Sequence, residues 1–200
     1  MCDQGGAVKT ERAALRAVCV FCGSNPGPSL PHRQAAEKLG AAIAQAGLRL
    51  IYGAGDKGLM GITARAALAN RGSVTGVIPA FLTEREGPLE GVQELIVTPT
   101  LQERKRTMLE RSDAFVVLPG GLGTLDEMLE LLTWAQFGLH AKPIVLLNID
   151  HFWDLLIELF EHMRQQGYLP AAPELNLRVE DDVAEVVPHL LKSAAGNANT

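Results

Sequence analysis

The sequence predicts a doubly wound α/β fold, with a mainly parallel sheet and helices on both of its faces. Short runs rich in valine, isoleucine and leucine alternate with longer stretches of helical periodicity, and this order builds such a sheet. Two of the short runs, Ala114–Leu118 and Pro143–Leu147, are apolar at consecutive positions. Consecutive apolar residues are typical of strands that are covered on both faces.

The same patterns give the bounds of each expected element. The expected strands are Arg16–Cys22, Leu48–Tyr52, Ser73–Ile78, Glu94–Val97, Asp113–Leu118 and Pro143–Asn148. The expected helices are Leu30–Ala46, Leu59–Asn70, Leu101–Arg111, Thr124–Phe137, Phe152–Gln166 and Asp181–Leu191. A chain of 200 residues without an internal repeat or linker predicts a single domain over 1–200. The polar ends, 1–13 and 193–200, are expected to be mobile tails.

The composition argues against several kinds of partner. The net charge of −5 disfavours a nucleic-acid partner, because binding to a phosphate backbone requires a basic surface. No apolar run approaches the roughly 18 residues of a membrane span, and the N-terminal segment lacks the apolar core of a signal peptide. We therefore expect a cytoplasmic protein that binds no nucleic acid and no membrane.

The cysteines and histidines give little support to a metal centre. Cys19 and Cys22 have the C-x-x-C spacing, but they lie in an apolar run that predicts a buried strand. Residues three apart in a strand point to opposite faces, so core packing is favoured over a redox or zinc site. The five histidines form no H-E-x-x-H motif. We expect no bound metal and no cofactor.

The segment PGGLGTLDE, residues 119–127, is the strongest functional signal. It follows a buried strand and begins an amphipathic helix, and its glycines let a ligand approach the backbone closely. The free N–H groups and the positive end of the helix dipole favour a phosphate there, and Thr124 adds a hydroxyl. The alternative is an ordinary turn in which Thr124 and Glu127 form a capping box.

A second glycine-rich turn, Gly53–Gly58, matches the G-x-G-x-x-G pattern. A dinucleotide site would also place an acidic residue at the end of the next strand, and the segment Gly76–Pro79 contains none. Neither turn continues into the G-K-S/T of a P-loop. Because ligands bind beyond the carboxyl ends of parallel strands, turns that face one crevice predict a mononucleotide site. Its candidate contacts are Ser24, Gly53, Gly55, Gly120, Gly121, Gly123 and Thr124.

Charges of alternating sign begin the helix expected at Leu101–Arg111. One interpretation is an exposed helix face with intrahelical ion pairs. However, the segment starts directly after a strand, on the expected ligand side of the sheet. Arg104 and Lys105 are therefore also candidates for binding a phosphate or a ribose, with a planar donor fork and a compact charge respectively.

Taken together, these segments resemble the LONELY GUY (LOG) family of cytokinin riboside 5′-monophosphate phosphoribohydrolases, whose members were often labelled lysine decarboxylase-like. The resemblance covers about residues 16–180 and rests on CGSNPG, YGAGDKGLMG, GVIP, QERK, PGGLGTLDE and TWAQFGLHAKPI. It implies a Rossmann-like fold and a homodimer or higher oligomer. It also implies hydrolysis of the N-glycosidic bond of a nucleoside 5′-monophosphate, which gives a free base and ribose 5-phosphate.

The resemblance further implies which residues act. Arg104 and Glu127 match the family's catalytic pair. The family's nucleotide contacts map onto Lys105, Gly120, Gly121, Gly123, Thr124, Glu86 and Thr133. Ala54, the pair Leu101–Gln102 and Asp126 depart from the family's usual residues. None of these departures identifies the preferred base, whether N6-modified adenine, plain adenine or another.

Three other functions compete with this one. A noncatalytic protein of the same fold that binds a nucleotide or the molybdenum cofactor would need the glycine turns but not the Arg104–Glu127 pair. A pyridoxal-phosphate lysine decarboxylase would need a Schiff-base lysine, and only Lys57 and Lys105 lie near the glycine turns. A nicotinamide enzyme would need the missing acid. The joint presence of Arg104 and Glu127 favours the hydrolase.

Overall fold

Seven parallel strands form one sheet at the centre of the molecule. The computed structural model describes residues 15–83, 87, 89–169 and 176–196. The strands are β1 Ala17–Phe21, β2 Arg49–Tyr52, β3 Val74–Pro79, β4 Glu94–Thr98, β5 Ala114–Val117, β6 Ile144–Leu147 and β7 Leu177–Glu180. Their order across the sheet is β4-β3-β2-β1-β5-β6-β7, and each neighbouring pair is parallel.

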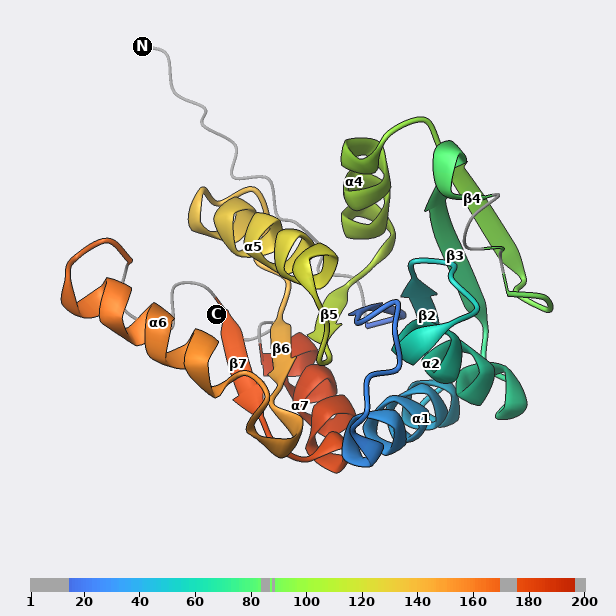
Figure 1. Cartoon of the computed structure of the whole chain (residues 1–200), viewed down its shortest axis with the longest axis horizontal. Coiled ribbons are helices and arrows are strands. Elements are labelled where there is room, and N and C mark those ends of the chain that lie inside the picture. The colour runs from blue at the N-terminus through green and yellow to red at the C-terminus, as the bar shows by residue number, and fades with distance from the viewer. Residues whose placement is uncertain (1–14, 84–86, 88, 170–175, 197–200) are drawn as a thin grey trace, which may run out of the picture.

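Helices cover both faces of the sheet (Figure 1). They are α1 Leu30–Gln45, α2 Gly58–Ala69, α4 Leu101–Arg111, α5 Leu122–Gln136, α6 Asp154–Gln165 and α7 Val183–Gly196. One hydrophobic core receives residues of α1, α2 and α7, and a second core receives residues of α4, α5 and α6. The predicted doubly wound α/β fold is therefore confirmed. Among the described helices, none is long and apolar enough to cross a membrane.

Strand β1 shows why its sequence is apolar at every position. All five of its residues are buried, and they alternate between the two cores, with Val18 and Val20 in one and Cys19 and Phe21 in the other. Cys22 belongs to the same core as Val20. Cys19 and Cys22 are both buried and free, and burial raises the pKa of each thiol. The prediction that their C-x-x-C spacing reflects core packing is thus confirmed.

Several element predictions differ from the structure, among them helix α5, which begins at Leu122 rather than Thr124. Strand β7 was not predicted, because its sequence LRVE is polar and only partly buried at the sheet edge. Helix α6 begins at Asp154 rather than Phe152, since the 3-10 turn Ile149–His151 precedes it. Ser193, expected to begin a polar tail, lies inside α7. The remaining tail residues, 1–13 and 197–200, lie outside the described residues.

The strand order defines where a ligand site belongs. Strands are added outward from β1 to β4 on one side of the sheet, and the chain then returns through α4 so that β5 pairs with β1 on the other side. In open α/β sheets, ligands bind beyond the carboxyl ends of the strands at such a reversal. The turns after β1 and β5 therefore flank the expected site.

Candidate active site

Three glycine-containing turns meet at the carboxyl edge of the sheet, beside the β1–β5 reversal. The N–H of Gly23, which follows β1, donates to the carbonyl of Pro119, which follows β5, at 3.0 Å. The carbonyl of Gly23 accepts a hydrogen bond from the N–H of Leu59, at the start of α2, also at 3.0 Å. The structure therefore brings the turns after β1, β2 and β5 into contact, as the sequence analysis expected for one crevice.

Close packing between these turns explains two of their glycines. Gly58 has a φ of +62°, and a Cβ there would overlap the backbone of Ser24 and Asn25. A Cβ on Gly120 would overlap the hydroxyl of Thr124. Ser24 is exposed. These glycines thus allow three backbone segments to approach one another at the rim of the site.

The start of α5 is open to a ligand. The helix begins at Leu122 with Gly121 as its N-cap, and no side chain caps its N-terminus. Gly121 and Gly123 are exposed, and a Cβ on either would meet nothing within 4 Å. The N–H groups of the first turn and the positive end of the helix dipole together form a favourable binding site for an anion. The two glycines leave space for a phosphate next to the backbone.

Arg104 is held by groups from three other segments. It lies in the first turn of α4, whose N-cap Thr100 accepts a hydrogen bond from the N–H of Glu103 at 3.1 Å. The Nε of Arg104 donates to the carbonyl of Val77 in β3 at 3.0 Å. A Cβ on Gly53 would overlap the Arg104 guanidinium. Gly53 therefore contributes room for this side chain, which gives it a role that its motif did not reveal.

Glu127 forms a buried ion pair with Arg104. The Nη1 of Arg104 donates to Oε1 of Glu127 at 2.6 Å, and the exposed fractions of the two side chains are 12% and 10%. Burial raises the pKa of Glu127 above its usual value, and the charge and hydrogen bond of Arg104 counteract this only in part. The pair places a carboxylate and a guanidinium together beside the open start of α5.

Lys105 holds α4 against α5. Its Nζ lies 3.0 Å from Oδ2 of Asp126 and 2.7 Å from Oε2 of Glu130. Partial burial lowers the pKa of Lys105, but its hydrogen bonds to the two carboxylates outweigh this effect and raise it. The nucleotide contact that the resemblance implies therefore belongs to a lysine that already has two carboxylate partners and lies next to the Arg104–Glu127 pair. Asp126 and Glu130 are site neighbours that the sequence analysis did not include among its candidates.

The other implied contacts lie apart from this pair or beyond the described residues. Thr133 is exposed, and its hydroxyl donates to the carbonyl of Leu129 in its own helix at 2.7 Å. Six residues along an α-helix amount to about 240° of rotation, so Thr133 and Glu127 lie on different faces of α5. Gly55 is buried within its turn. Glu86 lies outside the described residues.

The alternative capping box is wrong. It required Thr124 at the helix boundary, with Glu127 turned back to its own backbone. Instead, α5 begins two residues earlier, Thr124 is buried, and Glu127 points to Arg104. The described residues contain no group of three or more His, Cys, Asp or Glu side chains that could hold a metal ion. The chemistry that these residues provide is electrostatic. It comes from the Glu127 carboxylate, the Arg104 guanidinium and the N-terminus of α5, which can bind an anion.

The fold and the site place this chain in the class of doubly wound α/β proteins with a ligand site at the sheet's reversal point. The family model described as "Possible lysine decarboxylase" matches residues 60–190. A cytokinin riboside 5′-monophosphate phosphoribohydrolase from Rhodococcoides fascians is 43% identical over 173 residues, which cover 86% of this chain and 87% of that protein. The chain therefore belongs to this family, the LOG family that the motifs indicated.

Plant relatives agree with this assignment, and a solved structure shares the fold. Enzymes of the same name from Oryza sativa subsp. japonica and Arabidopsis thaliana are 40% and 38% identical, over 87% and 84% of this chain and 76% and 84% of their own length. The molybdenum cofactor carrier protein from Chlamydomonas reinhardtii superposes with a TM-score of 0.68 at 22% identity, over 91% of this chain and 99% of that structure. That likeness shows a shared fold.

The pKa of Glu127 provides a direct test of the site's electrostatics. We expect Arg104→Gln to raise this pKa further, because removal of a neighbouring positive charge disfavours the ionised carboxylate. A ¹³C NMR titration of the glutamate carboxyl groups measures the shift. The control is Arg106→Gln, which removes the same charge from an exposed position on α4. An unchanged Glu127 pKa in Arg104→Gln would contradict the described ion pair.

Proposed function

We propose that this chain hydrolyses the N-glycosidic bond of adenosine 5′-monophosphates, including those modified at N6, and releases the base and ribose 5-phosphate. The observation that carries the proposal is the buried Arg104–Glu127 pair beside the open start of α5. Its family context supports the proposal, since relatives at 38–43% identity are named cytokinin riboside 5′-monophosphate phosphoribohydrolases.

In this proposal, the start of α5 binds the 5′-phosphate. The exposed Gly121 and Gly123 leave the first-turn N–H groups without side-chain cover. A phosphate on these groups gains hydrogen bonds and the favourable end of the helix dipole. The nucleotide would thus be fixed by its phosphate, which accounts for a requirement for monophosphates over nucleosides.

Glu127 then acts on the ribose. Cleavage of the bond between C1′ and the base nitrogen passes through an oxocarbenium-like sugar, and a nearby carboxylate stabilises that positive charge. The bonding electrons leave with the base, which takes up a proton, and water supplies the hydroxyl at C1′. Because burial raises the pKa of Glu127, this carboxylate is a stronger base than an exposed one and can also take up a proton from the attacking water.

Arg104 orients Glu127 and offers a donor to the substrate. Its Nε and Nη1 are bound to Val77 and Glu127. Within the described residues, Nη2 makes no hydrogen bond, and it lies next to Gly53. This nitrogen can therefore donate to a ribose or phosphate oxygen, or stabilise charge that develops on the departing base.

The old family label of lysine decarboxylase fits the site less well. Schiff-base chemistry requires a lysine amine that can lose its proton. Lys105 is paired with two carboxylates that raise its pKa, which keeps this amine charged. A carrier function would leave the buried Arg104–Glu127 pair without a chemical role.

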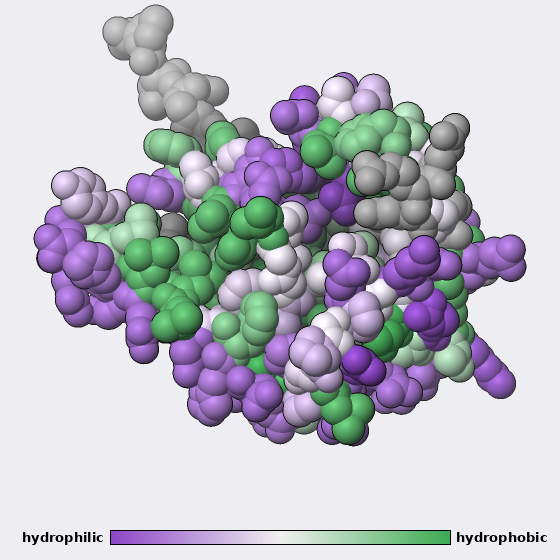
Figure 2. All heavy atoms as spheres, in the orientation of Figure 1, coloured by the Kyte–Doolittle hydropathy of each residue, from purple (hydrophilic) through white to green (hydrophobic). Residues whose placement is uncertain are grey.

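We also propose that the enzyme works as a homodimer through α5 and α6. Leu129, Thr133 and Phe137 repeat every four residues along α5 and form one exposed stripe. Leu155 and Leu159 form a similar exposed pair on α6, on the same face of the sheet. Figure 2 shows apolar side chains gathered over these two helices. Thr133 lies in this stripe, so its implied nucleotide contact fits a site shared between two copies.

A small-molecule substrate and a cytoplasmic location complete the proposal. The chain's net charge of −5 is unfavourable for nucleic acid. Cys19 and Cys22 are buried and unpaired, which agrees with a compartment in which thiols stay reduced.

The first prediction concerns Glu127→Gln. This variant keeps the side-chain volume and an acceptor for Arg104 but removes the charge that stabilises the sugar cation. We expect base release to fall at least about a hundredfold, within the range ascribed to general acid–base and electrostatic groups. Chromatography with AMP, isopentenyladenosine monophosphate and adenosine measures it. The control is Glu37→Gln, at an exposed position on α1. Near wild-type release by a folded Glu127→Gln protein would refute the proposal.

The second prediction concerns Gly123→Ala. A Cβ at this position meets no protein atom, and alanine is favoured over glycine in a helix by roughly 0.5–1 kcal/mol. We expect the melting temperature to stay equal or rise while the KM for the monophosphate increases, because the Cβ occupies space meant for the phosphate. Gln136→Ala, exposed on the same helix, is the control. An unchanged KM would exclude phosphate binding at the start of α5.

The third prediction concerns the homodimer. We expect Phe137→Asp combined with Leu155→Asp to convert a dimer into a monomer, because the charges would be buried against the second copy. Light scattering after size-exclusion chromatography measures the mass. Leu191→Asp is the control, since Leu191 is an exposed leucine on α7 at the other face of the sheet. Equal masses for all three proteins would argue against this interface.

A further inference from the structure

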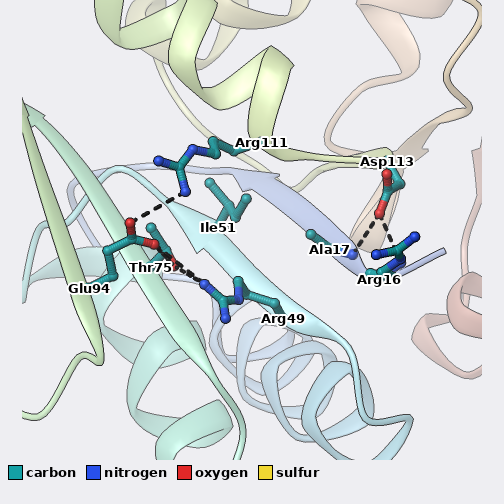
Figure 3. Close-up of a pocket in the computed structure, with 8 residues that line it drawn as sticks. All are labelled: Arg16, Ala17, Arg49, Ile51, Thr75, Glu94, Arg111 and Asp113. Atoms are coloured by element: carbon teal, nitrogen blue, oxygen red, sulfur yellow. Dashed lines mark hydrogen bonds and ion pairs between the residues drawn. The ribbon is translucent and has the colours of Figure 1, made fainter. Parts of the chain in front are cut away.

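A cavity lies at the amino edge of the sheet, opposite the candidate active site (Figure 3). It is lined by Arg16, Ala17, Arg49, Ile51, Thr75, Glu94, Arg111 and Asp113. These residues come from the starts of four neighbouring strands, from the last residue of α4 and from the segment before β5. The volume is about 450 Å³, which lies within the usual range of small-molecule sites.

The lining of this cavity carries more positive than negative charge. It holds three arginines against two carboxylates, although the whole chain has a net charge of −5. The Asp113 carboxylate is occupied by the backbone, because its Oδ2 accepts from the N–H groups of Arg16 and Ala17 at 2.8 and 2.9 Å. Among the described residues, the guanidinium of Arg16 has no carboxylate partner.

Glu94 is the carboxylate that faces the two other arginines, and the Nη1 of Arg49 also donates to the Thr75 hydroxyl at 3.4 Å. Its carboxylate lies 3.4 Å from Nη1 of Arg49 and 3.3 Å from Nη1 of Arg111. Both distances exceed the roughly 2.7–2.9 Å of a strong charge-assisted hydrogen bond. The two side chains are also 45% and 53% exposed, so each guanidinium keeps donors that are free for a ligand. Figure 3 shows both arginines reaching toward Glu94, Arg111 from the end of α4 and Arg49 from the start of β2.

We propose that this cavity binds a small organic phosphate monoester. A phosphate carries close to two negative charges near pH 7 and three acceptor oxygens, which match guanidinium forks on separate elements. Ala17 and Ile51, which are buried in the core below, are the apolar residues of its lining. The site is separate from the proposed hydrolytic site, since the two lie at opposite edges of the same strands.

Amide NMR of the full chain tests this proposal by location. Ribose 5-phosphate is titrated into ¹⁵N-labelled protein, with ribose as its uncharged counterpart. We expect saturable shifts of the Arg16, Ala17 and Asp113 amides with the phosphate ester and none with ribose. Binding at the proposed hydrolytic site instead shifts the amides of Gly121 and Gly123. Each proposal can therefore fail without the other.

Matched variants assign the shifts to the arginines. We expect Arg49→Gln combined with Arg111→Gln to weaken the affinity at the cavity about tenfold or more, because each loses a charge-assisted hydrogen bond. Arg106→Gln is the control, since Arg106 pairs with Glu110 on the exposed face of α4, and it should bind like the wild type. The proposal is overturned if millimolar ribose 5-phosphate leaves the cavity amides unshifted, if ribose shifts them equally, or if the folded double variant binds with unchanged affinity.

Discussion

The buried ion pair between Arg104 and Glu127 is the constraint on which the arrangement of this site depends. Both charges are largely removed from water, and loss of either partner leaves an uncompensated charge at a cost of about 3–5 kcal/mol. The surrounding backbone stabilises the buried Arg104 guanidinium. The carbonyl of Val77 accepts the Nε of Arg104, and the missing side chain of Gly53 makes room for the guanidinium. The pair thereby ties β3, α4 and α5 to one geometry.

Helix α4 connects the two edges of the sheet. Its first turn carries Arg104 and its last residue is Arg111, seven residues or about 10 Å apart along the helix axis. Lys105 adds ion pairs from this helix to Asp126 and Glu130 on α5. One helix therefore places Arg104 of the buried ion pair at the carboxyl edge and Arg111 of the arginine-lined cavity at the amino edge.

Most of the fold could be predicted from local sequence. Strands such as Ala114–Val117 are apolar at every position because both faces are covered, and the opposite orientation of Cys19 and Cys22 follows from the two-residue period of a strand. Strand β7 could not be predicted in this way. Its sequence, LRVE, becomes a strand because the edge of β6 provides a hydrogen-bonding partner. This pairing leaves no pattern in the local sequence of β7.

The sequence by itself determined the parallel α/β architecture, the glycine-rich start of α5 and the motif positions of Arg104 and Glu127. Only the tertiary structure decided that Glu127 pairs with Arg104 instead of capping its own helix, that Gly53 makes room for a guanidinium, and that arginines gather at the amino edge. The physical reason is the range of the interactions. Periodicity and turn chemistry act over a few residues, whereas these contacts join residues that are 23 or more positions apart and meet only once the sheet has formed.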